Sequence, residues 1–173
     1  MLGPRLDGAN GVSLRPPRIE DYHLFWRMQM LPETSRFWGP RYGEYTEERS
    51  TRRFRRDAVG PNAVNWAIWF GEEPVGFTGV FDIDWIRRDA ESGLFIGRPD
   101  LYGRGIASEA VRLRTEFARN QLRLHRVHNW IALTNLGSRR ANQKAGYTAV
   151  GTFERAWRRS GEWVTDWLGE VLL

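Results

Sequence analysis

The chain has 173 residues, a formal net charge of +5 and a hydrophobic content of 41%. These values fit one globular domain spanning residues 1–173 and exclude wholesale disorder or a fibrous repeat. Cysteine is absent, which excludes disulfides, thiolate metal sites and a cysteine nucleophile. No uncharged apolar run reaches the ~18 residues of a membrane helix, and the N-terminus lacks the apolar core of a secretory signal. We therefore expect a soluble, cytoplasmic protein that does not bind membranes.

The pattern of apolar residues predicts mainly helices in the first third of the chain. Residues 1–11 resemble a loose lead-in, and 12–15 form a short strand that two prolines end. Apolar spacings of three and four predict an amphipathic helix over 18–28. The aromatic, glycine- and proline-containing stretch 32–45 is expected to be an ordered loop. A second helix begins at an N-cap, Thr46, and runs to about residue 59.

Strands dominate the rest of the chain. Three apolar runs separated by turns predict an antiparallel meander. After it, apolar residues recur every three or four positions in a helix that begins at Gly105. The expected strands are 64–70, 75–81, 90–96, 127–133, 147–153 and 163–172, and the expected helices are 105–120 and 136–145. An arginine-rich loop, 154–162, is expected to join the last two strands.

A strand that ends near residue 97 leads into a glycine-rich turn and then a helix. Free N–H groups at a helix start converge on one point, and Gly103 and Gly105 let that backbone approach an anion such as pyrophosphate. The dinucleotide fingerprint does not fit, because Ser108 stands where its third glycine belongs. The P-loop pattern does not fit either. Ordinary loop closure is the alternative interpretation of two glycines in such a turn.

A second motif follows the next predicted strand, and with it the sequence resembles the GCN5-related N-acetyltransferase (GNAT) superfamily, above all the branch of ribosomal-protein N-terminal alanine acetyltransferases. The family's phosphate loop, R/Q-x-x-G-x-G/A, is matched by residues 102–107, with Tyr102 in place of Arg or Gln. The branch's later segment is matched by Asn135, Ser138, Lys144, Gly146 and Tyr147. The order of elements agrees from residue 12 to residue 172.

The resemblance implies an α/β (α+β) fold with a mixed, mostly antiparallel twisted sheet of about six to seven strands and about four helices. The strands that carry Leu94 and Ile131 would be parallel and splayed, leaving a groove for acetyl-CoA. The residues implied in cofactor binding are Phe95, Ile96, Tyr102, Gly103, Arg104, Gly105, Ile106, Ala107, Ser108 and Asn135. Capping of the following helix is the structural alternative for Asn135.

For catalysis, the resemblance points to Glu91 as the base that takes the proton of the attacking amine, directly or through water. Its structural alternative is a solvated carboxylate or an ion pair with Arg87 or Arg88; Asp82 and Asp84 are second choices. Many members use a tyrosine as the acid, but this chain has Asn142 at that place. Ser138 is therefore the candidate acid, with helix capping as its alternative.

The implied function is an acetyl-CoA-dependent N-acetyltransferase that moves an acetyl group to a primary amine of a protein N-terminus or a small molecule. The alternative is a catalytically silent module that binds CoA or nucleic acid on the same scaffold. We expect no metal, because His125 and His128 lie on opposite faces of a strand and have no third ligand.

The arginine cluster 52–56 could bind RNA or an acidic protein, but neighbouring acids favour a solvated helix face, so nucleic acid is not an expected partner. The expected state is a monomer or homodimer. The amine acceptor would be bound by the first helix, loop 32–45 and loop 154–162, with Trp38, Tyr42 and Trp157 as aromatic walls.

Overall fold

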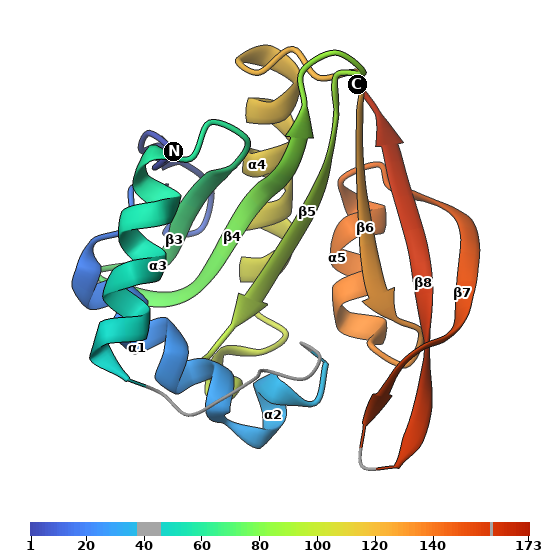
Figure 1. Ribbon diagram of the computed structural model, residues 1–173, viewed down its shortest axis with the longest axis horizontal. Helices are drawn as coiled ribbons and strands as arrows, with labels where there is room; N and C mark the ends of the chain where they lie inside the picture. Colours follow the sequence, from blue (N-terminus) through green and yellow to red (C-terminus); the bar gives the residue numbers. More distant parts are fainter. Residues whose placement is uncertain (38–45, 160) are drawn as a thin grey trace.

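The computed structural model describes residues 1–37, 46–159 and 161–173. In these residues it forms one eight-stranded sheet and five α-helices (Figure 1). The strands are β1 (Leu6–Asp7), β2 (Val12–Arg15), β3 (Val64–Phe70), β4 (Glu73–Asp84), β5 (Asp89–Ile96), β6 (Arg126–Ala132), β7 (Thr148–Arg159) and β8 (Glu162–Leu172). The helices are α1 (Ile19–Met30), α2 (Pro32–Ser35), α3 (Glu47–Val59), α4 (Ile106–Asn120) and α5 (Leu136–Lys144), with a 3₁₀ turn, η1 (Pro99–Leu101).

The strand order is β1-β2-β3-β4-β5-β6-β8-β7, and every pairing is antiparallel except β5 with β6. The α/β fold with a mixed, mostly antiparallel sheet is therefore confirmed, and so is the parallel pair that carries Leu94 and Ile131. Helix α4 connects these two strands, as the change of apolar period after Gly105 predicted.

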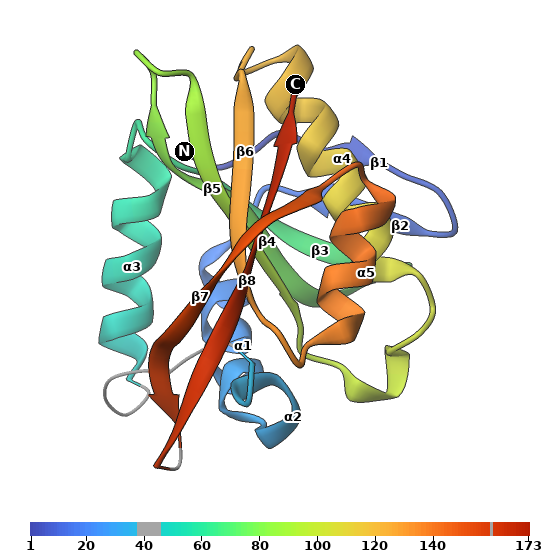
Figure 2. The same cartoon turned by 90° about the vertical axis from the view of Figure 1, so that its right-hand side faces the viewer.

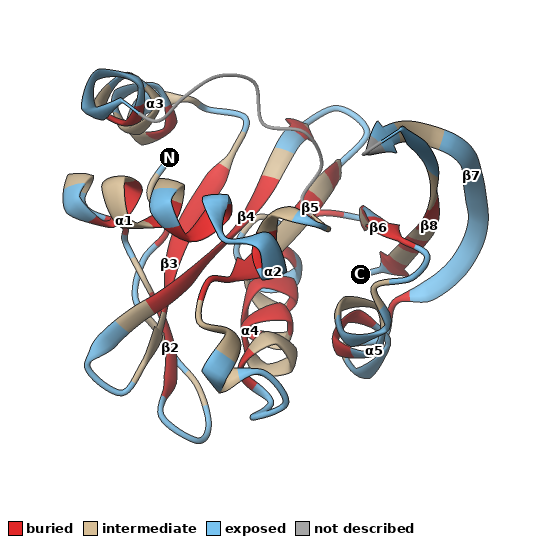
Figure 3. Ribbon diagram, turned by 90° about the horizontal axis from the view of Figure 1, so that it is seen from below, coloured by how far each residue is buried: buried red, intermediate tan, exposed pale blue. Residues whose placement is uncertain are grey.

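The helices cover the two faces of the sheet unequally (Figure 2). Helices α4 and α5 lie on one face, and the larger, mainly aliphatic core forms there. Helices α1 and α3 lie on the other face over a smaller aromatic core, in which Phe25 packs edge-on to Phe77 at 5.5 Å between ring centroids. Figure 3 shows the central strands as buried and the outer surface of β7 as exposed. We call these two sides the α4 face and the α1 face.

The expected loose lead-in at residues 1–11 is wrong, because the N-terminal segment is tied to the sheet. The Met1 ammonium donates to the carbonyls of Gly60 and Ala63 at 2.7 and 2.6 Å, and the Trp66 indole donates to the Pro4 carbonyl at 2.9 Å. Strand β1 then pairs with β2. Each of these partners except β2 is distant along the chain, so local sequence did not reveal them.

Two further expectations need correction. The stretch 32–45 is not wholly a loop, because Pro32 starts the short helix α2; residues 38–45, which include Trp38 and Tyr42, lie outside the described residues. The expected loop 154–162 is mostly strand. β7 continues past a bulge at Phe153–Trp157 and pairs with β8 down to Arg159 opposite Glu162. The added strand β1 and helix α2 account for the difference from the expected seven strands and four helices.

Candidate active site

Strands β5 and β6 lie close together at the top of Figure 1 and separate below it. Their ladder contains only three pairs and ends at Glu91 opposite His128. Beyond that point the strands diverge, and a groove of about 600 Å³ lies between them, bounded by α4, α5, η1 and α2. We call the end where the strands meet the vertex end, and the end at the start of α4 the phosphate end.

The phosphate end is built from the glycine-rich turn. Gly103 and Gly105 have φ values of +82° and +81°, and Gly105 is the N-cap of α4. A Cβ added at either glycine would meet nothing within 4 Å, so the space in front of this backbone is open to a ligand. The amides of the first turn of α4 have no partner earlier in that helix, and the helix dipole adds positive charge there. Arg140 and Lys144 of α5 line the same groove.

Most residues proposed from the sequence line this groove. They are Phe95, Ile96, Tyr102, Gly103, Gly105, Ile106, Ala107, Ser108, Asn135 and Ser138. Arg104 does not line it and is exposed on the turn. The Tyr102 hydroxyl donates to the Ile96 carbonyl at 3.1 Å, and this bond joins the turn to the end of β5.

Glu91 lies behind the groove, on the α1 face. Its cross-strand partner is Phe81, which packs against the aromatic core, and paired residues share a face of the sheet. Burial, helped by the negative charge of Asp82, raises the pKa of Glu91. No ion pair of Glu91 exists among the described residues: Arg87 pairs with Asp84, and Arg88 donates to the Arg123 carbonyl. A half-buried, unpaired carboxylate at the vertex suits a proton acceptor.

The two second-choice carboxylates differ in environment. Asp84 accepts from the backbone N–H groups of Ile86 and Arg87 at 2.9 and 2.8 Å. These bonds lower its pKa, and they give Asp84 a structural role in the β4–β5 turn. Asp82 is exposed and has a positive φ of 48°. Its charge acts on Glu91 across the strand pair.

His128 is a vertex residue that sequence reasoning set aside. On β6, it lies between Glu91 of β5 and Glu170 of β8, and it is the register partner of both. Burial lowers its pKa, while the charges of Asp89 and Glu170 act in the opposite direction. The sequence placed His128 correctly on a strand beside the one that carries Leu94, but it did not predict the register that puts His128 opposite Glu91.

The start of α5 separates the two roles considered for Asn135 and Ser138. The Asn135 side-chain oxygen caps the helix by accepting from the Ser138 N–H at 3.2 Å. The Ser138 hydroxyl is not the cap and has no hydrogen bond among the described residues. Ser138 lines the groove. The side-chain amide nitrogen of Asn135 makes no hydrogen bond among the described residues, so it can donate to a ligand.

A polar network beneath the vertex end was also missed by sequence reasoning. Arg114 of α4 is 1% exposed and donates to Thr78 Oγ1 and the Gly93 carbonyl, both at 2.9 Å. The Asn142 side-chain oxygen accepts from Arg114 Nη2 at 3.4 Å and from Asn129 Nδ2 at 2.7 Å. Asn142 therefore joins α4, α5 and β6 under the groove.

The hairpin of β7 and β8 contributes a carboxylate on the α1 face. Trp167 is in the main core and its ring lies 5.9 Å from the Arg139 guanidinium of α5, so its neighbour Asp166 points the opposite way. Asp166 is 9% exposed, accepts from the Trp157 indole at 3.1 Å and has no cation partner among the described residues. Burial raises its pKa. Trp130 and Phe153 form an exposed aromatic pair with 5.8 Å between their ring centroids, and Phe153 is the β7 partner of Asp166.

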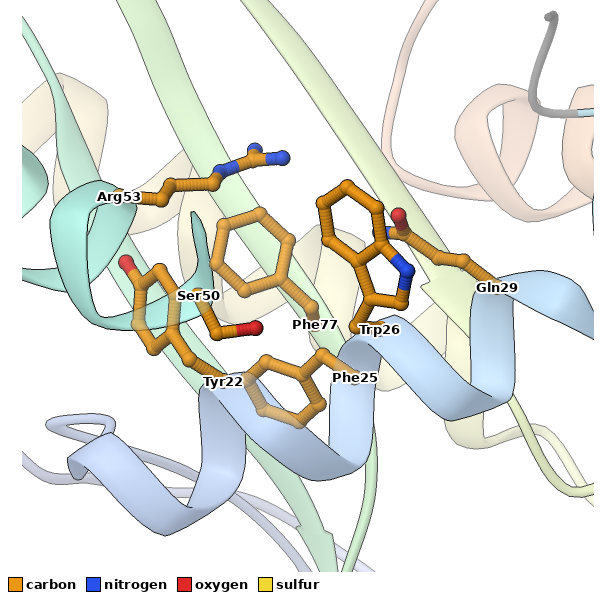
Figure 4. Close-up of a pocket in the computed structure, with 7 residues that line it drawn as sticks. All are labelled: Tyr22, Phe25, Trp26, Gln29, Ser50, Arg53 and Phe77. Carbon is orange, nitrogen blue, oxygen red and sulfur yellow. The ribbon is translucent and has the colours of Figure 1, made fainter. Parts of the chain in front are cut away.

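A second, much smaller hollow lies between α1, α3 and β4 (Figure 4). Its volume is about 20 Å³, room for roughly one water molecule. The Arg53 guanidinium lies 6.0 Å from the Phe77 ring, and the Tyr22 hydroxyl donates to Asp57 at 3.0 Å. This hollow belongs to the packing of α1 on α3 and is too small for an organic ligand.

The described residues contain no group of three or more His, Cys, Asp or Glu side chains that could hold a metal ion. No helix among them is long and apolar enough to cross a membrane.

The model of the acetyltransferase (GNAT) domain family matches residues 12–148. This chain belongs to the GNAT acetyltransferase family. The match covers both halves of the groove, from the phosphate end to α5. Membership of this family supports acetyl-CoA-dependent acetylation of an amine, as the resemblance implied.

Individual proteins that are similar in sequence to this chain are also named as acetyltransferases. The probable N-acetyltransferase YjcK of Bacillus subtilis (strain 168) is 39% identical over 61 residues, which are 35% of this chain and 34% of that protein; the match thus spans about a third of its length. Spermidine N(1)-acetyltransferase of Escherichia coli (strain K12) is 22% identical over 157 residues, covering 84% of this chain and 77% of that protein.

Solved structures share the fold. Spermidine N-acetyltransferase from Vibrio cholerae, in complex with CoA and spermine, has a TM-score of 0.85 at 15% identity and covers 94% of this chain and 95% of its own. RimJ of Mycobacterium smegmatis, with CoA-disulfide, has a TM-score of 0.81 at 22% identity, with coverage of 97% and 85%. A putative acetyltransferase from T. thermophilus has a TM-score of 0.78 at 28% identity, with coverage of 98% and 89%.

Proposed function

We propose that the protein binds acetyl-CoA in the groove between β5 and β6 and that an amine attacks the thioester directly at the vertex end, with Glu91 as general base and Ser138 as general acid. The observation that carries this proposal is the single groove that joins an anion-binding helix start to the strands beside Glu91. The pyrophosphate is held by the amides of residues 103–108, and the pantetheine arm lies along the edge of β5 that β6 leaves open.

The alternation of β5 indicates how the arm is held. The Gly97 N–H donates to the Val75 carbonyl of β4, so the backbone groups of alternate residues, including Phe95, point toward β4. Those of Leu94 and Ile96 point to the groove. A pantetheine amide can add to this edge in the manner of a further strand. The Asn135 amide donor lies across the groove from it.

In the reaction, the amine gives up a proton as its lone pair attacks the carbonyl carbon, and Glu91 accepts that proton directly or through a water. The raised pKa of Glu91 makes its carboxylate a stronger base than an exposed one. The carbon–sulfur bond then breaks, the electron pair stays on sulfur, and the Ser138 hydroxyl donates to it. Deprotonation is required because an amine is mostly protonated near neutral pH.

The acceptor enters from the α1 face, and we propose that it is a positively charged amine. Glu91 and Asp166 both lie on that face, the first half-buried and the second buried, and neither has a cationic partner among the described residues. The aromatic surfaces of Trp157 and Trp130 can contact the methylenes or the charge of an ammonium. Relatives include enzymes named for spermidine and RimJ, so a polyamine and a protein N-terminus are the acceptors to compare.

The test is a thiol-release screen with acetyl-CoA against polyamines, aminoglycoside-like amines, amino acids and peptides with free N-termini. Because the chain has no cysteine, every free thiol detected comes from CoA. We expect release only with an added amine and loss of release in Glu91→Gln. Binding of CoA with no release for any amine would favour the catalytically silent module. A steep fall of nucleic-acid affinity with salt would favour its nucleic-acid form.

Three narrower predictions belong to the same proposal. We propose that residues 1–173 act as one acetyltransferase domain, that the protein works in the cytoplasm, and that it is a monomer or homodimer. Size-exclusion chromatography with light scattering measures the last of these.

A further inference from the structure

Arg114 is a buried cation that has no role in the reaction proposed above. Its side chain is 1% exposed and lines the groove. Among the described residues its guanidinium donates to the neutral oxygens of Thr78, Gly93 and Asn142. The side chain of Tyr147 is a further uncharged hydrogen-bond partner. Its Nε has no partner, and no carboxylate lies within ion-pair distance among the described residues. Burial lowers the pKa of Arg114, but a guanidinium is such a strong base that it stays protonated in proteins.

Such an arrangement is costly for a purely structural residue. Burying a charge without a counter-charge opposes folding, and an apolar residue of similar volume would avoid that cost. The charge is not needed to hold the strands, because the Thr78 hydroxyl already donates to the same Gly93 carbonyl at 3.0 Å. A buried cation without a counter-charge creates a positive potential in the groove beside it.

The position of Arg114 relative to the cofactor follows from the helix that carries it. Arg114 is eight residues after Ile106, the first residue of α4, so it lies about 12 Å from the phosphate end along the helix axis. Its partner Gly93 is two residues beyond the last β5–β6 pair, and Asn142 contacts Asn129, which is one residue beyond it. Arg114 therefore lies at the vertex end, where the arm delivers the thioester.

We propose that Arg114 stabilises the negative charge that develops on the CoA sulfur as the carbon–sulfur bond breaks. This inference rests on the proposed function. The amine nitrogen forms the new bond to the carbonyl carbon, the bonding pair of the old bond moves to sulfur, and the amine proton leaves to Glu91 or water. The guanidinium carries a fixed positive charge and moves no proton. Asn142 holds it, because the Asn142 oxygen accepts from Arg114 and its amide donates to the Ser138 carbonyl at 2.8 Å.

The experiment measures the ionisation of the thiol of CoA while it is bound. The ultraviolet absorbance of the thiolate is titrated with pH for the CoA complex of the wild type and for free CoA. The chain contributes no thiol, since it has no cysteine. A positive charge close to the sulfur lowers the midpoint by about one to three pH units relative to free CoA.

Arg114→Gln is the decisive variant. Its complex is expected to titrate like free CoA, with kcat reduced about a hundredfold and acetyl-CoA affinity little changed, because the thioester carries no charge. Arg114→Lys keeps the charge and is expected to retain most of the shift. Thr78→Val is the matched control: it removes a hydrogen bond of the same guanidinium but leaves the charge in place, so its midpoint should stay lowered.

A normal thiol midpoint in wild-type complex overturns the inference, and this measurement needs no variant to fold. An unchanged, lowered midpoint in Arg114→Gln also overturns it, since the shift then has another source. Failure of the wild type to bind CoA at all would instead overturn the proposed function.

Discussion

The two ends of the groove are built in different ways. The phosphate end is made by one continuous segment, in which Gly103, Gly105 and the first turn of α4 present backbone amides. The vertex end is assembled from side chains on five elements: Glu91 on β5, Arg114 on α4, His128 and Asn129 on β6, and Asn142 on α5, with Thr78 of β4 beneath them. One end depends on backbone geometry and the other on where separate elements meet.

This difference predicts which functions the two ends can lose independently. Changes at the phosphate end should weaken cofactor binding and leave the chemical step intact once the site is saturated. Changes at the vertex end should slow the chemical step and leave cofactor affinity intact. Measuring acetyl-CoA affinity and kcat on the same variants tests this separation of roles.

The largest effect is expected for Glu91→Gln. Loss of a general base lowers kcat by about a hundredfold or more, and acetyl-CoA affinity should stay close to the wild-type value. Because the carboxylate acts only when deprotonated and burial raises its pKa, wild-type activity should rise with pH through that raised pKa. The variant should lack this limb and follow only the ionisation of the amine. Wild-type kcat in the variant at every pH would move the base to Asp82.

The next effect is expected at the other end, for Gly105→Val. A β-branched side chain at φ +81° strains the backbone and places methyl groups where the pyrophosphate approaches. We expect CoA affinity to fall by about ten- to a hundredfold, with kcat at saturation nearly unchanged. Gly71→Val is the matched control, since Gly71 also has a positive φ and open space but lies in the β3–β4 turn. Equal CoA affinity in both folded variants would contradict the phosphate assignment.

A smaller loss is expected for Ser138→Ala. The departing thiolate is a fairly stable anion and is already stabilised by charge, so the hydroxyl contributes less than the base, about tenfold in kcat. The helix cap is unaffected, because the cap is the Asn135 oxygen bonded to the Ser138 backbone. Thermal stability should therefore match the wild type. A large loss of stability with no change in kcat would make Ser138 a structural residue.

The smallest effect is expected for Asp166→Asn, which removes a charge from the α1 face. If this carboxylate contacts a cationic acceptor, the KM for that amine should rise about five- to tenfold, while CoA affinity and kcat change little. Trp157→Phe is the companion variant, because it removes the 3.1 Å bond to Asp166 and keeps an aromatic ring. A neutral competing amine should be accepted equally well by Asp166→Asn and wild type. Unchanged KM for every charged amine would exclude Asp166 from acceptor binding.

The sequence by itself determined the elements and motifs that depend on neighbouring residues. The period of apolar residues located the amphipathic helices and all strands except β1, and Thr46 was recognised as an N-cap, where its side chain accepts from the Arg49 N–H. The glycines of the phosphate end were identified because a helix start needs only contiguous backbone. The length of β7 and the order of the N-terminal segment were misjudged, since both depend on partners across the sheet.

Only the tertiary structure decided what the vertex end contains. In the sequence, Arg114 is one of several polar residues of a predicted helix, and nothing there indicates that it is buried. In the structure it is enclosed by β4, β5 and α5 and donates to a residue of each. Glu91 could have been paired with Arg87 or Arg88, and the turn directs those arginines elsewhere. Asn135 and Ser138 could each have capped α5, and the backbone geometry assigned the cap to Asn135. The physical reason is common to all three: the charge state and role of a buried polar group depend on which distant groups replace water around it.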